Sequence, residues 1–132
     1  MSQSTRMSRI LLVEEDATLL DITAFRLELL GYEVVTQESA EQALQWIDEQ
    51  LPSLIIVDTT LPGMGGIEFI NRLSNEVRTS EVPVMVISTN SDLDDVQKAF
   101  NAGADEYLVI PYDPLVLEAK VERLASAVLQ NS

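Results

Sequence analysis

Acidic side chains follow two of the apolar segments of this chain, and they are the residues best suited to chemistry. Glu14 and Glu15 come directly after the apolar run 10–13, and Asp58 comes directly after the apolar run 54–57. If the two runs are neighbouring strands of a parallel sheet, the three carboxylates meet at one edge. Two carboxylates about 4–5 Å apart repel each other by roughly 3–4 kcal/mol at an effective dielectric constant near 20. A folded domain keeps such a cluster only when a proton or a cation relieves this repulsion.

The residue types around these acids indicate which cation and which reaction to expect. The chain has no histidine and no cysteine, and oxygen-only ligands favour a hard ion such as Mg²⁺. The backbone carbonyl of Thr60 could add a ligand. Asp58 is then the natural nucleophile, because a carboxylate can accept a phosphoryl group while the metal neutralises charge. Ser88 and Thr89, which follow the apolar run 84–87, offer hydroxyls for a phosphoryl oxygen.

Short apolar runs alternate with segments of helical periodicity, which is the pattern of βα repeats around a parallel sheet. The expected strands are 10–13, 34–35, 54–57, 84–87 and 107–110. Crossovers of this length are right-handed, so the helices cover both faces of the sheet. The sequence therefore predicts a doubly wound α/β fold with a five-stranded parallel sheet, a flavodoxin-like (βα)5 sandwich with strand order 2-1-3-4-5. We expect a flexible tail over residues 1–8 and one domain over residues 9–130.

Capping and stop signals set the expected limits of the helices. The predicted N-caps are Asp16, Ser39, Ser91 and Asp113, and the predicted stops are Gly31, Pro52 and Gly103. The expected inward-facing residues are, helix by helix, Leu19, Leu20, Ile22, Phe25, Leu27 and Leu29; Ala40, Ala43, Leu44, Ile47 and Leu51; Ile67, Ile70, Leu73 and Val77; Val96, Ala99 and Phe100; and Leu117, Val121, Leu124 and Val128.

Composition narrows the partners that this chain can have. The 132 residues carry a formal net charge of −14, so the surface repels phosphate backbones and we expect no direct contact with nucleic acid. The longest apolar runs are too short to cross a bilayer, and the N-terminal residues lack the apolar stretch of a signal peptide. We therefore expect a cytoplasmic domain without a membrane partner.

Four segments resemble, in order, the landmarks of response-regulator receiver domains of two-component systems. They are residues 13–16, 57–66, 83–89 and 103–111, and the resemblance extends over residues 9–129. It implies a histidine kinase or phosphotransfer protein as phosphoryl donor, and a downstream protein partner or output domain that reads a switching face. The residues that it implies are an acidic pair at Glu14 and Glu15, the phosphoacceptor Asp58, a metal-ligating carbonyl at Thr60, a phosphate-sensing hydroxyl at Ser88, a small neighbour at Thr89, an aromatic switch at Tyr107 and a cis peptide bond before Pro111.

Two positions depart from the family pattern. The family has aspartate where Glu15 stands, and lysine where Ile110 stands. A charge-assisted hydrogen bond of the kind that such a lysine makes is worth roughly 1.5–3 kcal/mol, so its loss should cost about one to two powers of ten in phosphoryl transfer or in coupling to the switch. This leaves a second hypothesis open, a pseudo-receiver that acts as an interaction module without phosphorylation. An enzyme of the aspartate-nucleophile phosphohydrolase class is not expected, because such enzymes have a second acid where Thr60 stands.

Overall fold

The structure, a computed structural model, describes residues 8–131, with side chains described through residue 126. The predicted tail over residues 1–8 lies outside the described residues except for Ser8, and the side chain of Val128 also lies outside them.

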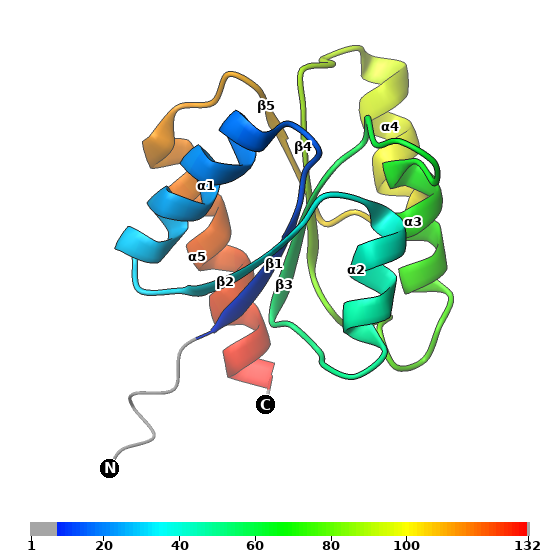
Figure 1. Cartoon of the computed structure of the whole chain (residues 1–132), viewed down its shortest axis with the longest axis horizontal. Helices are drawn as coiled ribbons and strands as arrows, with labels where there is room; N and C mark the ends of the chain where they lie inside the picture. The colour runs from blue at the N-terminus through cyan, green and yellow to red at the C-terminus, as the bar shows by residue number, and fades with distance from the viewer. Residues whose placement is uncertain (1–7, 132) are drawn as a thin grey trace.

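Five parallel strands form a single sheet in the order β2-β1-β3-β4-β5 (Figure 1). The strands are β1 (Arg9–Val13), β2 (Glu33–Gln37), β3 (Leu54–Asp58), β4 (Val84–Ser88) and β5 (Glu106–Val109). The predicted strand order and fold class are confirmed. β5 begins one residue earlier than predicted and ends before Ile110, although the N–H of Ile110 still donates to the carbonyl of Ser88 at 2.8 Å.

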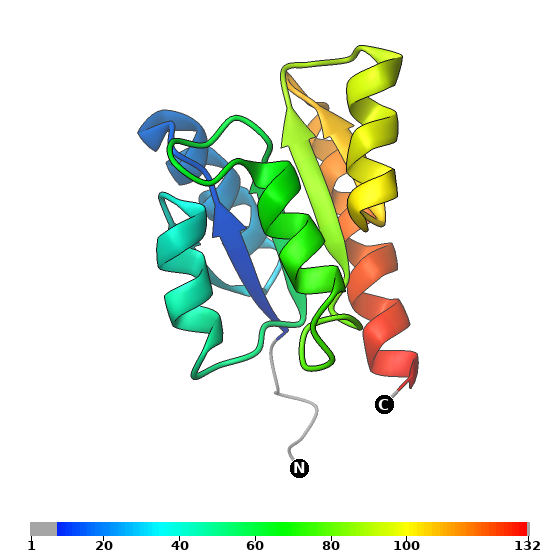
Figure 2. The same cartoon turned by 90° about the vertical axis from the view of Figure 1, so that its right-hand side faces the viewer.

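Helices cover both faces of this sheet. They are α1 (Ala17–Leu29), α2 (Ala40–Ile47), α3 (Gly66–Ser74), α4 (Leu93–Ala102) and α5 (Pro114–Asn131). Figures 1 and 2 show α1 and α5 on one face and α2, α3 and α4 on the other. The alternating side chains of the strands accordingly divide between two buried clusters, since Leu11 and Ile55 belong to the α2–α4 side and Leu12 and Ile56 to the α1–α5 side.

Local capping explains where the helices begin. Three predicted N-caps are confirmed by bonds from backbone N–H groups to the side chains, from Leu19 to Asp16 at 3.0 Å, from Gln42 to Ser39 at 3.1 Å and from Leu115 to Asp113 at 2.8 Å. Each bond satisfies a donor that the first helical turn leaves free.

The predicted cap at Ser91 is wrong. α4 begins after Asp92, whose side chain makes no capping bond. Asn90 orders this loop instead, because its Oδ1 accepts from the N–H of Asp92 at 3.1 Å. The loop that follows β4 is therefore held by an asparagine side chain before the helix begins.

The wide apolar face predicted for α1 is wrong in part. Leu20 and Leu27 are buried, but Ile22, Phe25 and Leu29 are 49%, 61% and 68% exposed. A helix that packs on a sheet buries one face, made of residues spaced three, four and seven positions apart. In α1 this face contains Leu20, Thr23 and Leu27. Leu19 is half-buried. Ile22, Phe25 and Leu29 form a separate, exposed stripe along the helix, which we call the α1 stripe.

Three other expected core residues are exposed for related reasons. α2 ends at Ile47 and α3 at Ser74, so Leu51 and Val77 lie beyond the helices and are 46% and 94% exposed. On α4 the buried contact is made by Ala99, while the neighbouring Phe100 turns partly toward solvent.

Replacing Leu27 and Leu29 separately with alanine tests this division of α1. Leu27→Ala should lower the free energy of unfolding by about 3–5 kcal/mol, because it leaves a cavity in the core. Leu29→Ala removes the same atoms from an exposed position and should change it by no more than about 0.5 kcal/mol. Urea denaturation of both variants gives the comparison, and similar losses in the two would contradict the assigned packing.

Candidate functional site

The carboxyl ends of β1, β3 and β4 form the rim that the sequence predicts. Val13 pairs with Val57 in the β1–β3 register, so the next residues, Glu14 and Asp58, leave the sheet side by side. Asp58 pairs with Ile87 across β3 and β4, which brings the end of β4 to the same place. The expected meeting of residues more than forty positions apart is confirmed for Glu14 and Asp58.

Glu14 is a buried acid in an unfavourable setting. Its side chain is 2% exposed, and its Oε2 accepts from the N–H of Asp16 at 3.0 Å. Its Oε1 is buried without a hydrogen-bond partner. Burial, together with the neighbouring carboxyl of Asp58, raises the pKa of Glu14 to about 8 against the lowering effect of the Asp16 N–H. Such a pair retains a proton or binds a cation.

Glu15 does not join this pair. It is exposed, and residues 8–126 contain no group of three or more His, Cys, Asp or Glu side chains placed to hold a metal. The described residues therefore bring Glu14 and Asp58 together without Glu15. β1 ends at Val13 and the chain bends at Glu15, so Glu14 is buried while Glu15 is exposed.

Asp58 is half-buried and held in place by its own turn. Its Oδ1 accepts from the N–H of Thr60 at 2.8 Å, which is an Asx turn. The turn brings the backbone of Thr60 back beside the carboxylate while leaving the other carboxylate oxygen free of this bond. The Asp58 oxygen that does not accept this bond is therefore available as a nucleophile, next to the backbone of Thr60.

A glycine permits helix α3 to start against this segment. A Cβ built on Gly66 would lie 2.5 Å from the carbonyl oxygen of Asp58 and 2.6 Å from the Cα of Thr59, which no other residue could accommodate without a shift. The N–H of Gly66 donates to the carbonyl of Thr59 at 3.2 Å. Gly66 thus lets the first turn of α3 lie directly against the segment that follows Asp58.

Ser88 is fully buried at the end of β4. Its Oγ accepts from the N–H of Asn90 at 3.0 Å and from the Oγ1 of Thr59 at 3.2 Å. Thr89, which the sequence also indicates, is exposed and has no side-chain hydrogen bond within the described residues. Sequence reasoning missed Thr59 and Asn90, although the β3–β4 register, which places residue 59 level with residue 88, could have indicated the first.

Tyr107 joins the same network through the backbone of Asn90. Its side chain is 9% exposed, and its hydroxyl donates to the carbonyl of Asn90 at 2.7 Å. Asn90 therefore bonds to Ser88 through its N–H and to Tyr107 through its carbonyl. The two predicted switch residues are connected by a single residue of the β4–α4 loop.

No cation replaces the family lysine at the end of β5. Ile110 is half-buried and packs against the cluster on the α1–α5 side, and the Ile110–Pro111 peptide bond is cis, as the resemblance implies. The chain has two lysines. Lys120 pairs with Glu106 at 2.9 Å, and Lys98 lines a cleft beside the site together with Thr59, Thr60, Ile67, Asn90 and Asp95.

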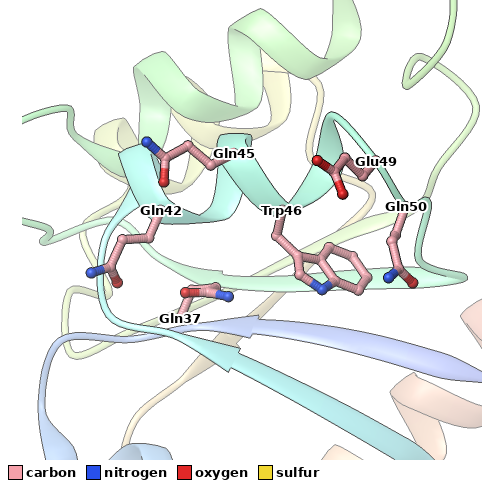
Figure 3. Close-up of a pocket in the computed structure, with 6 residues that line it drawn as sticks. All are labelled: Gln37, Gln42, Gln45, Trp46, Glu49 and Gln50. Atoms are coloured by element: carbon pink, nitrogen blue, oxygen red, sulfur yellow. The ribbon is translucent and has the colours of Figure 1, made fainter.

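A polar groove between α2 and β2 is separate from this rim (Figure 3). It is lined by Gln37, Gln42, Gln45, Trp46, Glu49 and Gln50, with the indole lying between the helix and the strand. None of the predicted site residues lines it. The half-buried Trp46 packs against the core cluster on this face.

A five-stranded parallel (βα)5 sandwich with an acidic pair at its rim, a hydroxyl on β4 and an aromatic residue on β5 has the architecture of a phosphoryl-accepting signalling domain. The family model described as "Response regulator receiver domain" matches residues 10–122. The chain belongs to this family, and it is a receiver domain of the two-component response-regulator type.

Individual relatives agree with this assignment. The phosphate regulon transcriptional regulatory protein PhoB of Escherichia coli K12 is 34% identical over 114 residues, which are 86% of this chain and 50% of PhoB. The chain thus spans about half the length of the curated relatives that it matches.

Solved structures show the same fold. A CheY-like receiver domain protein from Methanospirillum hungatei is 28% identical, with a TM-score of 0.88 over 96% of this chain and all of the other. The receiver domain of the sensor histidine kinase PA1611 from Pseudomonas aeruginosa, which has a magnesium ion coordinated in its active-site cleft, is 24% identical with a TM-score of 0.85 over 92% and 99% of the two chains.

The raised pKa of Glu14 predicts how stability depends on pH without metal. Because the folded protein holds this proton up to a pKa of about 8 and the unfolded chain releases it near its usual value, the free energy of unfolding should fall as pH rises between these values, by at most about 1.4 kcal/mol per pH unit. Urea denaturation in a chelator from pH 5 to 9 measures this slope.

Glu14→Gln should remove most of the slope, and Glu15→Gln, which neutralises the exposed neighbour, should retain it. Equal slopes in the wild type and in Glu14→Gln would show that Glu14 is not the group that titrates.

Proposed function

We propose that Asp58 accepts a phosphoryl group from a histidine kinase or phosphotransfer protein, with Mg²⁺ bound at the rim. The observation that carries the proposal is the pair formed by the buried Glu14 and the half-buried Asp58, in which Glu14 Oε1 has no hydrogen-bond partner among the described residues. A hard cation would satisfy this oxygen and relieve the repulsion between the two carboxyls.

The residues that would hold the ion all supply oxygen. They are Glu14, Asp58 and the backbone carbonyl of Thr60, with Glu15 as the acid on the exposed side of the same loop. The bound ion would supply charge neutralisation during phosphoryl transfer. The Asx turn holds the Asp58 carboxylate in place, and the end of β4 supplies the Ser88 hydroxyl next to it. Thr89, which follows Ser88, is the exposed small residue beside the site.

The switch that we propose runs along the Ser88–Asn90–Tyr107 connection. A phosphoryl oxygen at Asp58 would accept from the Ser88 O–H, and a shift of Ser88 toward it would strain the bond that its Oγ accepts from the Asn90 N–H. The Tyr107 hydroxyl bonds to the same residue, so the face made by α4, β5 and α5 would change with it. A downstream protein or an output domain would read that face.

The α1 stripe supports a protein as phosphoryl donor. Ile22, Phe25 and Leu29 are exposed on the helix that begins directly after the Glu14–Asp16 loop, so a partner that covers them would lie beside Asp58. Exposed apolar stripes of this kind mark protein contacts. The net charge of −14 supports the absence of direct nucleic-acid contact by this chain.

A cytoplasmic location belongs to the same proposal. Within the described residues, no helix has the length and apolarity that crossing a membrane requires.

The second candidate, a pseudo-receiver that works as a phosphorylation-independent interaction module, rests on Ile110. Without a cation at this position the phosphoryl group loses one charge-assisted hydrogen bond. That loss slows transfer but leaves the nucleophile, the acidic pair and Ser88 in place, and for this reason we favour the phosphorylated receiver.

Intact mass spectrometry after incubation with acetyl phosphate and Mg²⁺ separates the two candidates. The wild type should gain the mass of one phosphoryl group, and Asp58→Ala should gain none, because the nucleophile is absent. Ile110→Lys should speed the labelling by about ten- to a hundredfold, in proportion to the restored hydrogen bond. A folded wild type that stays unlabelled at high donor concentration would favour the interaction module.

Amide NMR during titration with fluoroberyllate and Mg²⁺, which imitate the phosphoryl group, tests the switch. Resonances of Ser88, Asn90 and Tyr107 should shift together, and the changes at Asn90 should shrink in Tyr107→Phe, which lacks the bond to its carbonyl. Shifts confined to the Asp58 turn would show that binding does not reach the loop.

A further inference from the structure

The buried hydroxyl of Ser88 is surrounded by donors, one of which the proposed function leaves without a role. Asn90 donates its N–H to Ser88 Oγ at 3.0 Å, and Thr59 donates its hydroxyl to the same oxygen at 3.2 Å. A serine hydroxyl has two acceptor positions and one hydrogen to donate. Both acceptor positions of Ser88 are therefore occupied, and its own O–H is the one group left.

Thr59 is held firmly enough to fix this arrangement. Its carbonyl accepts from the N–H of Gly66, and the absence of a side chain at Gly66 lets the start of α3 lie against the Cα of Thr59. Its neighbour Asp58 is locked in the Asx turn. The Thr59 side chain thus extends from a fixed backbone toward β4, where it reaches Ser88.

The direction of the Ser88 O–H matters more in this chain than in one that has a lysine at position 110. A phosphoryl oxygen needs donors as its charge develops, and Ile110 offers none. With Thr59 and Asn90 on the other side of its oxygen, Ser88 can donate only away from them. In the absence of the Thr59 hydroxyl, the Ser88 side chain could rotate and donate its hydrogen bond to another acceptor.

We propose that Thr59 is a positioning residue, whose hydroxyl fills one acceptor position of Ser88 and so directs the Ser88 O–H to a phosphoryl oxygen on Asp58. The inference rests on the proposed function, because it assigns Thr59 a role toward the same phosphoryl group. Thr59 itself makes no contact with that group in this scheme. Its effect passes entirely through Ser88.

The affinity for fluoroberyllate in the presence of Mg²⁺, measured by calorimetry or NMR, provides the test. Thr59→Val keeps the shape of the side chain and removes its hydroxyl, and it should weaken binding by about two- to tenfold, as expected for one neutral hydrogen bond. Thr59→Ser keeps the hydroxyl and should bind nearly as the wild type does. Thr36→Val, the same change at an exposed position of β2, should have no effect.

The double variant shows whether Thr59 acts through Ser88. In a Ser88→Ala background, Thr59→Val should cause no further loss, because the hydroxyl that it positions is gone. Unchanged affinity in Thr59→Val, or an equal loss with and without Ser88, would overturn the inference while leaving Asp58 as the phosphoacceptor. A folded wild type that binds no fluoroberyllate would overturn the proposed function, and this inference with it.

Discussion

The repulsion between two neighbouring carboxyl groups is the constraint on which the rest of this domain depends. Parallel pairing of β1 with β3 places Glu14 beside Asp58, and burial of Glu14 prevents water from screening the pair. Folding keeps this unfavourable contact because the core on both faces of the sheet compensates for it. The site is then ready for a positive charge, and the β4 hydroxyl and the Asx turn are arranged around the place where that charge would be.

Much of this arrangement could be predicted from the sequence, because parallel strands impose it. The apolar runs predict the ends of β1, β3, β4 and β5 to within one residue. The pairing of β1 with β3 then brings residues 14 and 58 together, independently of the segments that connect the two strands. The N-caps at Asp16, Ser39 and Asp113 were also predictable, since each depends only on residues within one turn.

The predictions that fail concern side chains whose burial or hydrogen bonding depends on contact with another helix or strand. The α1 stripe looked like core because its residues are apolar, but only one face of α1 meets the sheet. Glu15 is predicted as a third ligand because it is next to Glu14, but the chain bends at Glu15 and leaves its side chain exposed. Thr59 and Asn90 were missed because their roles depend on a hydroxyl in another strand, which no local pattern reveals.

The two buried clusters lie on opposite faces of the sheet, and the proposed switch would act on them to different extents. Tyr107 belongs to the cluster beneath α2, α3 and α4, whereas Ile110 and Tyr112 belong to the one beneath α1 and α5. The connection from Ser88 through Asn90 reaches the first cluster at Tyr107. The second cluster meets Ser88 through the backbone N–H of Ile110, whose apolar side chain offers no hydrogen-bond donor to the rim. Under the proposed switch, a protein that binds α1 would meet a surface less altered by phosphoryl transfer than the face of α4, β5 and α5.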